Sequence, residues 1–387
     1  MPEIKHVYLD HAATTQPHPE VAKAMRPYLE ERFGNPSALY ALGRESRDAI
    51  EGARKKVAAL INASSDEVYF TSGGSESDNM ALLGALLANE EKGNHIVTTT
   101  VEHHAVLATA EFLAKHGYAA TFVEVDSRGV VDPGEIRRAI MPETVVVSVM
   151  HANNEVGTIE PVREVAEVCR EAGVYVHSDA VQTVGNIPVD VDELGVDLLS
   201  MSGHKLYGPK GVGAIYIRKG TKTSRFIHGG EQERGMRAGT ENIAGIVGLG
   251  VAAEMAALEM DEKVERITAL RDRLIEGLTG SIENIFFNGH PETRLPNNAH
   301  LGIKFIEGEA TCLQLDTFGI FASTGSACSS EALEPSHVLL AMGVPPRDAQ
   351  GSVRFSLGRG TTPEDIDYVI EKLPPVVARL RSMSPLK

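Results

Sequence analysis

The segment TVVVSVMHANNEVGTIEPVREVAEVCREAGVYVHS (144–178) starts and ends with a short run rich in valine. Between these runs, residues 161–172 place Val162, Val165 and Val168 at helical spacing. A short apolar run, an amphipathic stretch and a second apolar run are typical of strand, helix and strand. This segment therefore predicts a β-α-β unit, in which the two strands run parallel.

Further β-rich runs surround this unit, again separated by amphipathic stretches. They are EVYFT (67–71), HIVTT (95–99), ATFVEV (120–125), DLLSMS (197–202) and VGAIYI (212–217). Alternating strands and helices favour an α/β fold, whose sheet is covered by helices on both faces. We expect a mostly parallel seven-stranded sheet.

The pattern changes in the last third of the chain. Residues 244–279 predict one long helix, after which IFFN (285–288), AHLGIKF (299–305) and VRFSL (353–357) alternate with helices, the last over about 364–383. This indicates a smaller α+β domain. We expect a large domain over 15–255 and a small domain made of 1–14 and 256–387.

Composition narrows the class of protein. The 387 residues carry a formal net charge of −16, which disfavours direct nucleic-acid binding because phosphate backbones attract clustered Lys and Arg. Residues 1–20 lack the apolar core of a signal peptide, and the apolar stretch 244–258 contains Glu254 and is too short to span a membrane. Cys169, Cys312 and Cys328 are too widely spaced for a zinc motif and too few for a disulfide framework. We expect a cytoplasmic enzyme.

Polar residues follow several predicted strands, where active sites of parallel sheets collect. In FTSGGSESDN (70–79), glycines and hydroxyls open a helix and favour a phosphate, although Ser75 also suits plain helix capping. In TTTVEHHAV (98–106), His103 and His104 suit stacking on a planar cofactor, metal ligation or a structural role.

Two further strand ends carry an acid and an amine. Asp179 in VHSDAVQT (176–183) suits a protonated pyridine nitrogen, or a helix N-cap. Lys205 in SMSGHKLYGPKGVG (200–213) suits an imine-forming lysine in a cleft, whereas Lys210 beside it reads as solvated. A phosphate cup, a ring stacker, an acid and such a lysine together describe a site for pyridoxal 5'-phosphate (PLP).

The chain resembles the cysteine desulfurase family, group V of the fold-type I PLP enzymes. Motifs typical of the family run nearly from end to end. They include YLDHAATT (8–15), FGNPSA (33–38), FTSGGSESDN, EHHAV (102–106), HANNEVGTIEP (151–161), HSDAVQT, SGHKLYGPKGVG, GGEQERGMRAGTEN (229–242), STGSACSSEALEPSHVL (323–339) and VRFSLGRGTT (353–362). One departure is Gly73-Gly74-Ser75, where the family often has Gly-Ala-Thr.

The resemblance assigns a role to each matching position. It implies Lys205 as the lysine that holds the cofactor, Asp179 as partner of the ring nitrogen and His104 as the ring stacker. The residues that it implies for the phosphate are Gly74, Ser75, Ser202 and His204, joined by Thr240 acting in the neighbouring subunit of a homodimer. It further places Gln182 and Asn154 near the phenolic oxygen and the substrate, with Arg354 as anchor of the substrate carboxylate.

Cys328 distinguishes the activities open to such a site. It lies in the small, polar stretch STGSACSSE, which predicts an exposed loop, whereas Cys169 and Cys312 read as buried. The resemblance implies that L-cysteine gives alanine and a persulfide on Cys328, which is passed to an iron–sulfur scaffold or a tRNA-thiolation protein. No resident metal is expected, although Cys328 could ligate a cluster within a complex. The alternatives are a PLP aminotransferase or lyase for another amino acid, and an inactive scaffold.

Overall fold

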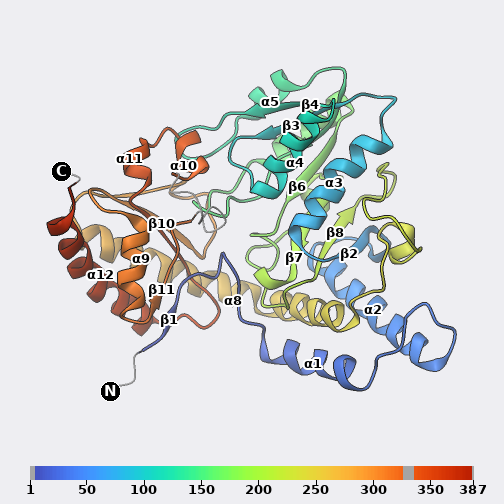
Figure 1. The fold of residues 1–387 in the computed structure, drawn as a ribbon, viewed down its shortest axis with the longest axis horizontal. Coiled ribbons are helices and arrows are strands. Elements are labelled where there is room, and N and C mark those ends of the chain that lie inside the picture. The colour runs from blue at the N-terminus through green and yellow to red at the C-terminus, as the bar shows by residue number, and fades with distance from the viewer. Residues whose placement is uncertain (1–4, 326–334, 386–387) are drawn as a thin grey trace.

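The computed structural model describes residues 5–325 and 335–385. Its centre is a seven-stranded sheet of order β2-β8-β7-β6-β5-β3-β4 (Figure 1). The strands are β2 (Val68–Thr71), β3 (His95–Thr99), β4 (Ala119–Val123), β5 (Thr144–Ser148), β6 (Tyr175–Asp179), β7 (Leu198–Ser202) and β8 (Gly213–Ile217). Strand β8 runs antiparallel to both of its neighbours, β2 and β7, and all other pairs in the sheet are parallel. The prediction of a mostly parallel seven-stranded sheet is confirmed.

Helices cover both faces of this sheet (Figure 1). On one face α3 (Gly74–Ala88) and α4 (His104–Lys115) pack an apolar cluster against the strands. On the other face lie α2 (Ala41–Leu60), α5 (Pro133–Ala139), α6 (Val162–Ala172) and the first part of α8 (Ile243–Ser281). Burial on both sides explains why β5 reads as TVVVS, with every residue buried, instead of alternating polar and apolar residues.

The remaining helices of this part are short or peripheral. They are α1 (Pro19–Glu30) and α7 (Val191–Leu194), with single turns η1 (Ser65–Glu67), η2 (Gly203–Lys205) and η3 (Glu233–Gly235). The β-α-β unit ends α6 at Gly173, whose φ of 67° lies in the left-handed region that glycine adopts at low cost. The chain can then enter β6 directly.

A second apolar cluster belongs to the C-terminal part of the chain and to the N-terminal strand. It packs around an antiparallel sheet of β9 (Ile285–Phe287), β10 (Asn298–Ile303) and β12 (Ser352–Ser356), and around the pair β1 (Val7–Tyr8) and β11 (Ile320–Phe321). The helices here are α9 (Gly308–Asp316), α10 (His337–Ala341), α11 (Pro346–Ala349) and α12 (Pro363–Met383).

Helix α8 joins the two parts, as the long gold helix in Figure 1 shows. Its residues up to Ala256 belong to the cluster beneath the large sheet, and those from Ile267 onward to the second cluster. Among the described residues it alone is long and apolar enough to cross a membrane, but 56% of its most apolar window is buried within the protein. Such burial is typical of a core helix. The predicted domain boundary after residue 255 falls inside this helix and stays a prediction.

Candidate active site

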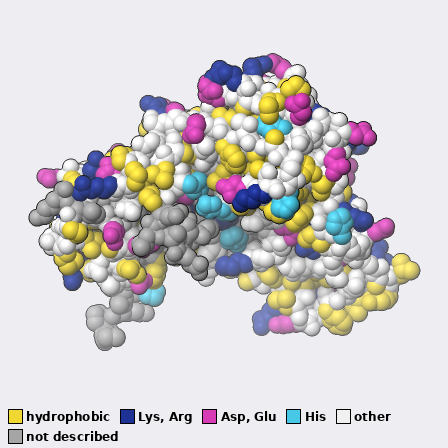
Figure 2. Space-filling view, turned by 45° about the horizontal axis from the view of Figure 1, so that its top comes forward, with side chains coloured by type: hydrophobic (Ala, Val, Ile, Leu, Met, Phe, Trp, Pro, Cys, Tyr) yellow, Lys and Arg dark blue, Asp and Glu magenta, His cyan; other side chains and the backbone are white. Residues whose placement is uncertain are grey.

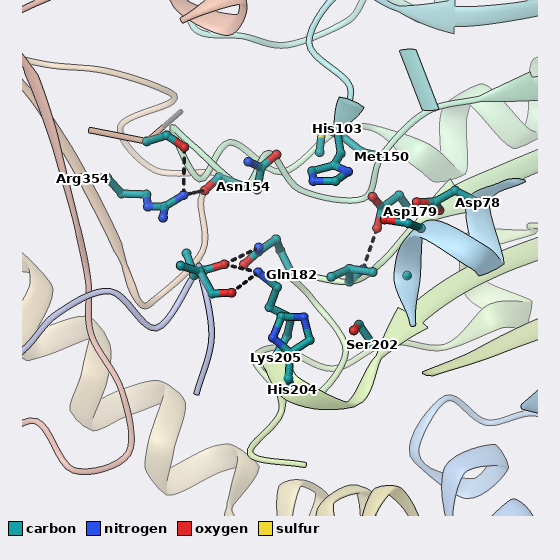
Figure 3. A pocket seen from close by; sticks show the side chains of 16 residues that line it. Asp78, His103, Met150, Asn154, Asp179, Gln182, Ser202, His204, Lys205 and Arg354 are labelled. Carbon is teal, nitrogen blue, oxygen red and sulfur yellow. Dashed lines mark hydrogen bonds between the residues drawn. The ribbon is translucent and has the colours of Figure 1, made fainter. Parts of the chain in front are cut away.

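A cavity of about 290 Å³ opens where β6 and β7 end (Figure 3). Its size is close to the lower end of the ~300–1,000 Å³ usual for small-molecule sites. Nine of the residues predicted for the site line it: Gly74, Ser75, Asn154, Asp179, Gln182, Ser202, His204, Lys205 and Arg354. In the space-filling view, His side chains gather around the hollow between the two parts of the chain (Figure 2).

Lys205 enters the cavity from the single turn η2 that follows β7. Its Nζ donates hydrogen bonds to the backbone oxygens of Ala12 and Ala13, the latter at 2.8 Å. Gln182 Nε2 donates to the same Ala12 oxygen at 3.0 Å. The N-terminal segment therefore forms one wall and holds the amine in place. Lys210, by contrast, is exposed, as its sequence context suggested.

An anion-binding corner lies at the start of α3. The first N–H groups of a helix lack partners within the helix and carry partial positive charge, which favours a phosphate. Ser75, Ser202 and His204 add side chains around this corner. A Cβ added to Gly74 would come within 2.7 Å of Val181 Cγ2, so the absence of a side chain there keeps the corner open.

Asp179 forms another wall and is 5% exposed. Its Oδ1 accepts the Val181 N–H at 2.9 Å, but the residues that follow form turns and no helix, so Asp179 is not a helix N-cap. Burial raises the pKa of Asp179, while the positive charges that His103 and Lys205 can carry lower it. A cation placed against this wall would therefore stabilise the ionised carboxylate.

The histidine on the cavity wall is His103, which corrects the prediction for His104. His103 is the N-cap of α4, and its Nδ1 accepts the Ala105 N–H at 3.1 Å. His104, the first helical residue, is exposed and lies beside His337, with ring centroids 4.7 Å apart. A cap residue and the first residue of a helix point in different directions, and this one-residue difference decides which ring reaches the cavity.

Arg354 lies on β12 with only 2% of its surface exposed, opposite Asp179 across the cavity (Figure 3). Its Nη2 donates to Asp10 Oδ1 at 2.8 Å, and its Nη1 donates to the backbone oxygen of Asn154 at 2.8 Å. Its Nε is buried without a hydrogen-bond partner among the described residues. Arg354 therefore forms an ion pair with Asp10 and also lines the cavity.

Besides His104, two predicted residues are not on the cavity wall in the described part of the chain. Thr240 is exposed and lines a separate hollow beside Arg237 and Asn242. Cys328 falls outside the described residues, although Gly325, three positions before it, lines the cavity.

Of the other lining residues, Ala12, Ala13, Asp78 and Met150 were not assigned to the site from the sequence, and His103 was considered only together with His104. The block YLDHAATT (8–15) was the available signal for the first two, but their contribution is through backbone oxygens, which residue types do not reveal.

The Aminotransferase class-V family matches residues 7–369. The chain belongs to this family. It is 55% identical to the cysteine desulfurase IscS of Dictyoglomus turgidum, over 99% of this chain and 97% of that protein. A solved NifS-like protein superimposes with a TM-score of 0.91 at 39% identity, covering 97% of this chain and all of that one. A structure titled SspA in complex with cysteine gives a TM-score of 0.82 at 33% identity, covering 91% of this chain and 98% of that one.

This class V aminotransferase family member uses PLP, and the cavity offers what that cofactor requires. The helix N-terminus and its hydroxyls suit the phosphate, and the amine of Lys205 suits the aldehyde. The buried Asp179 carboxylate suits a protonated ring nitrogen, and His103 suits the face of the ring. His103, Asp179 and Lys205 would therefore hold the ring of the cofactor.

Proposed function

We propose that this protein is a cysteine desulfurase, which takes the sulfur of L-cysteine onto Cys328 and releases alanine. The observation that carries this proposal is one cavity with an amine, a buried acid and a carboxylate-binding arginine: Lys205, Asp179 and Arg354. Cys328 follows three residues after Gly325 on the wall, a chain length that spans at most about 11 Å.

Each of these groups has a part in the reaction. The bound cofactor supplies an electron-withdrawing ring that makes the α-proton of an amino acid acidic. Lys205 takes that proton, Asp179 holds negative charge at the ring nitrogen, and Arg354 binds the substrate carboxylate. The Cys328 thiolate then attacks the substrate sulfur. The Cβ–S bond breaks, an S–S bond forms, and the carbon keeps the electron pair, takes a proton and becomes the methyl group of alanine.

Cys328 is the thiol suited to this attack because the other two are unreactive. Burial raises the pKa of both Cys169 and Cys312 to about 12, so that almost none of either thiol is ionised near pH 8. A persulfide on Cys328 would be passed to an iron–sulfur scaffold or a tRNA-thiolation protein in the cytoplasm. The net charge of −16 suits an acceptor with a basic surface.

Substituting Arg354 by lysine is expected to raise KM for L-cysteine about 10–100-fold, with a smaller change in kcat. Lysine keeps the charge but loses the planar pair of donors, and a hydrogen bond to a charged group contributes about 1.5–3 kcal/mol. The measurement is steady-state alanine formation over a range of L-cysteine concentrations. Arg359→Lys is the matched control, since Arg359 pairs with Glu259 outside the cavity. Equal KM values in the Arg354 variant and wild type would contradict the assignment of this anchor.

The partner that completes the site is a second copy of the chain. Exposed apolar side chains gather around the segment between α1 and α2, the yellow patch at the lower right of Figure 2. They are Leu29, Phe33, Leu39, Tyr40 and Leu42, with Leu39 84% exposed. Burying such a patch against another subunit is favourable, and Thr240 would then be free to meet the phosphate corner of that subunit.

Leu39→Asp is expected to convert a particle of twice the chain mass into one of the chain mass. A buried, unpaired charge at an interface is costly, so the variant should dissociate at micromolar concentration. Light scattering coupled to size exclusion measures the mass. Leu258→Asp, at an equally exposed leucine on α8, is the control and should stay dimeric. A wild-type protein that runs as a monomer would overturn this part of the proposal.

A further inference from the structure

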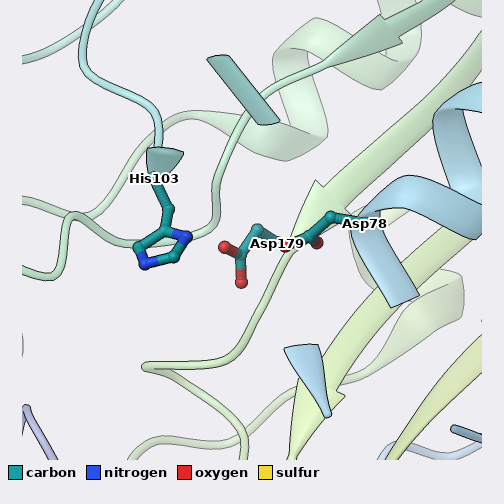
Figure 4. Close-up of side chains that lie close together, drawn as sticks. All are labelled: Asp78, His103 and Asp179. Atoms are coloured by element: carbon teal, nitrogen blue, oxygen red, sulfur yellow. The ribbon is translucent and has the colours of Figure 1, made fainter. Parts of the chain in front are cut away.

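A second buried carboxylate lies beside Asp179. Asp78, on α3, is 1% exposed, and one polar atom each of Asp78, His103 and Asp179 lie within 4.8 Å of one another (Figure 4). Among the described residues, neither Asp78 oxygen has a partner in good hydrogen-bond geometry, although the Ser200 side chain lies near enough to lower the pKa of Asp78. Two carboxylates this close and this dry cannot both be ionised without strong repulsion, so the pair retains a proton.

Apart from His103, the titratable groups around Asp78 offer it no positive charge. His177 on β6 has its Nε2 at 3.6 Å from Asp78 Oδ1, but burial lowers the pKa of His177 to about 3. Both of its ring nitrogens also contact hydroxyls, of Ser148 at 2.8 Å and Ser200 at 2.9 Å. From the loop before α4, Glu102 is fully buried, and burial raises its pKa well above the usual range; as an acid it brings no positive charge.

The two acids differ in what they face. Burial, followed by the charge of Asp179, raises the pKa of Asp78 well above its usual range. Burial also raises the pKa of Asp179, but that acid faces His103 and Lys205, whose positive charges lower it. The environment is therefore asymmetric: both acids line the cavity, but His103 and Lys205 lower the pKa of Asp179 and no cation does so for Asp78.

We propose that Asp78 is a positioning residue that keeps the proton of the Asp78–Asp179 pair, so that Asp179 alone carries the negative charge facing the cavity. One anion then matches the one positive charge of a protonated ring nitrogen. An ionised Asp78 would place a second charge on the same wall with no cation to balance it. That the negative charge of Asp179 serves the cofactor ring rests on the proposed function, whereas the position of the proton on Asp78 does not.

Infrared difference spectroscopy of the cofactor-loaded protein tests this directly. Aspartate labelled with ¹³C at the side-chain carboxyl shifts every Asp band, and spectra at pH 7.5 are compared for wild type, Asp78→Asn and Asp179→Asn. We expect the C=O stretch of one protonated, buried Asp to be absent in Asp78→Asn and present in Asp179→Asn. Loss of this band in Asp179→Asn with its survival in Asp78→Asn would put the proton on the wrong acid and overturn the proposal. If each variant lost only the band of an ionised carboxylate, neither Asp would be protonated in wild type, which would also overturn the proposal.

The pH dependence of stability provides a second test, which remains valid if one variant binds the cofactor poorly. An unfolded Asp ionises near pH 4, whereas a folded, protonated Asp78 must keep its proton. The wild type therefore loses stability as pH rises, whereas Asp78→Asn has no such proton to lose. The folding equilibrium constant of the variant, divided by that of the wild type, should rise about tenfold per pH unit from pH 5 to 7. A flat ratio would contradict the proposal. Neither measurement depends on turnover. The proposal about the proton can therefore fail while cysteine desulfuration is confirmed, and cysteine desulfuration can fail while the proposal about the proton is confirmed.

Discussion

Replacing Lys205 by alanine is expected to reduce alanine formation from L-cysteine by about 10²–10⁴-fold, the usual contribution of a positioned proton-transfer group. The side chain reaches the cavity from η2, and the Ala13 oxygen fixes its Nζ at 2.8 Å. No other lysine lines the cavity among the described residues, so no neighbour can take over the proton transfer. The measurement is the rate of alanine formation at saturating L-cysteine.

Lys210→Ala is the matched control for this variant. Lys210 lies five positions further along the chain, is exposed and does not line the cavity, so its loss should leave the rate within about twofold of wild type. Added methylamine offers a further check, because a small amine that enters the space left by Lys205 should restore part of the rate. A Lys205→Ala protein with wild-type turnover would remove the basis for the whole site.

Replacing Cys328 by serine is expected to reduce persulfide formation and sulfide release to background. A thiolate attacks sulfur readily, whereas a serine hydroxyl stays protonated at neutral pH and cannot form an S–S bond. The variant should still bind L-cysteine, because Lys205, Asp179 and Arg354 are unchanged. Mass spectrometry of the protein after exposure to L-cysteine, with and without reductant, reads the extra sulfur atom.

Cys169→Ala and Cys312→Ala are the controls for the thiol. Since burial raises the pKa of both thiols to about 12, neither supplies thiolate near pH 8, and both variants should carry sulfur as the wild type does. Cys169 belongs to the apolar cluster under α6, so its truncation costs stability instead of sulfur transfer. Persulfide on either of these residues in wild type would contradict the role of Cys328.

Much of the fold could be predicted from local patterns of apolar and polar residues in the sequence. Every predicted strand run lies within two residues of an observed strand, because buried strands such as β5 are continuous runs of valine. The order of the strands and the reversal of β8 depend on which strands pair across the sheet. Pairing is a property of tertiary packing, and a single sequence carries no direct signal for it.

The site was predictable to the extent that it consists of side chains at strand ends. Lys205 and Asp179 come together because parallel strands β6 and β7 are neighbours and end at the same edge. The prediction was wrong at His104, where the choice between adjacent histidines depends on the cap geometry of α4. Asp78 was not assigned to the site, because its burial beside Asp179 depends on how α3 packs against the end of β6, which no local pattern reveals.

The measurement that tests the central claim most directly is the product ratio of the wild-type protein. Purified, PLP-loaded protein is mixed with L-cysteine and a thiol reductant, and alanine, sulfide and pyruvate are quantified together. Removal of sulfur by way of a protein persulfide predicts alanine and sulfide in equal amounts, with no pyruvate. Sulfide accompanied by pyruvate and ammonia instead of alanine would indicate a lyase, and a cofactor-loaded protein that forms no sulfide would exclude cysteine desulfuration.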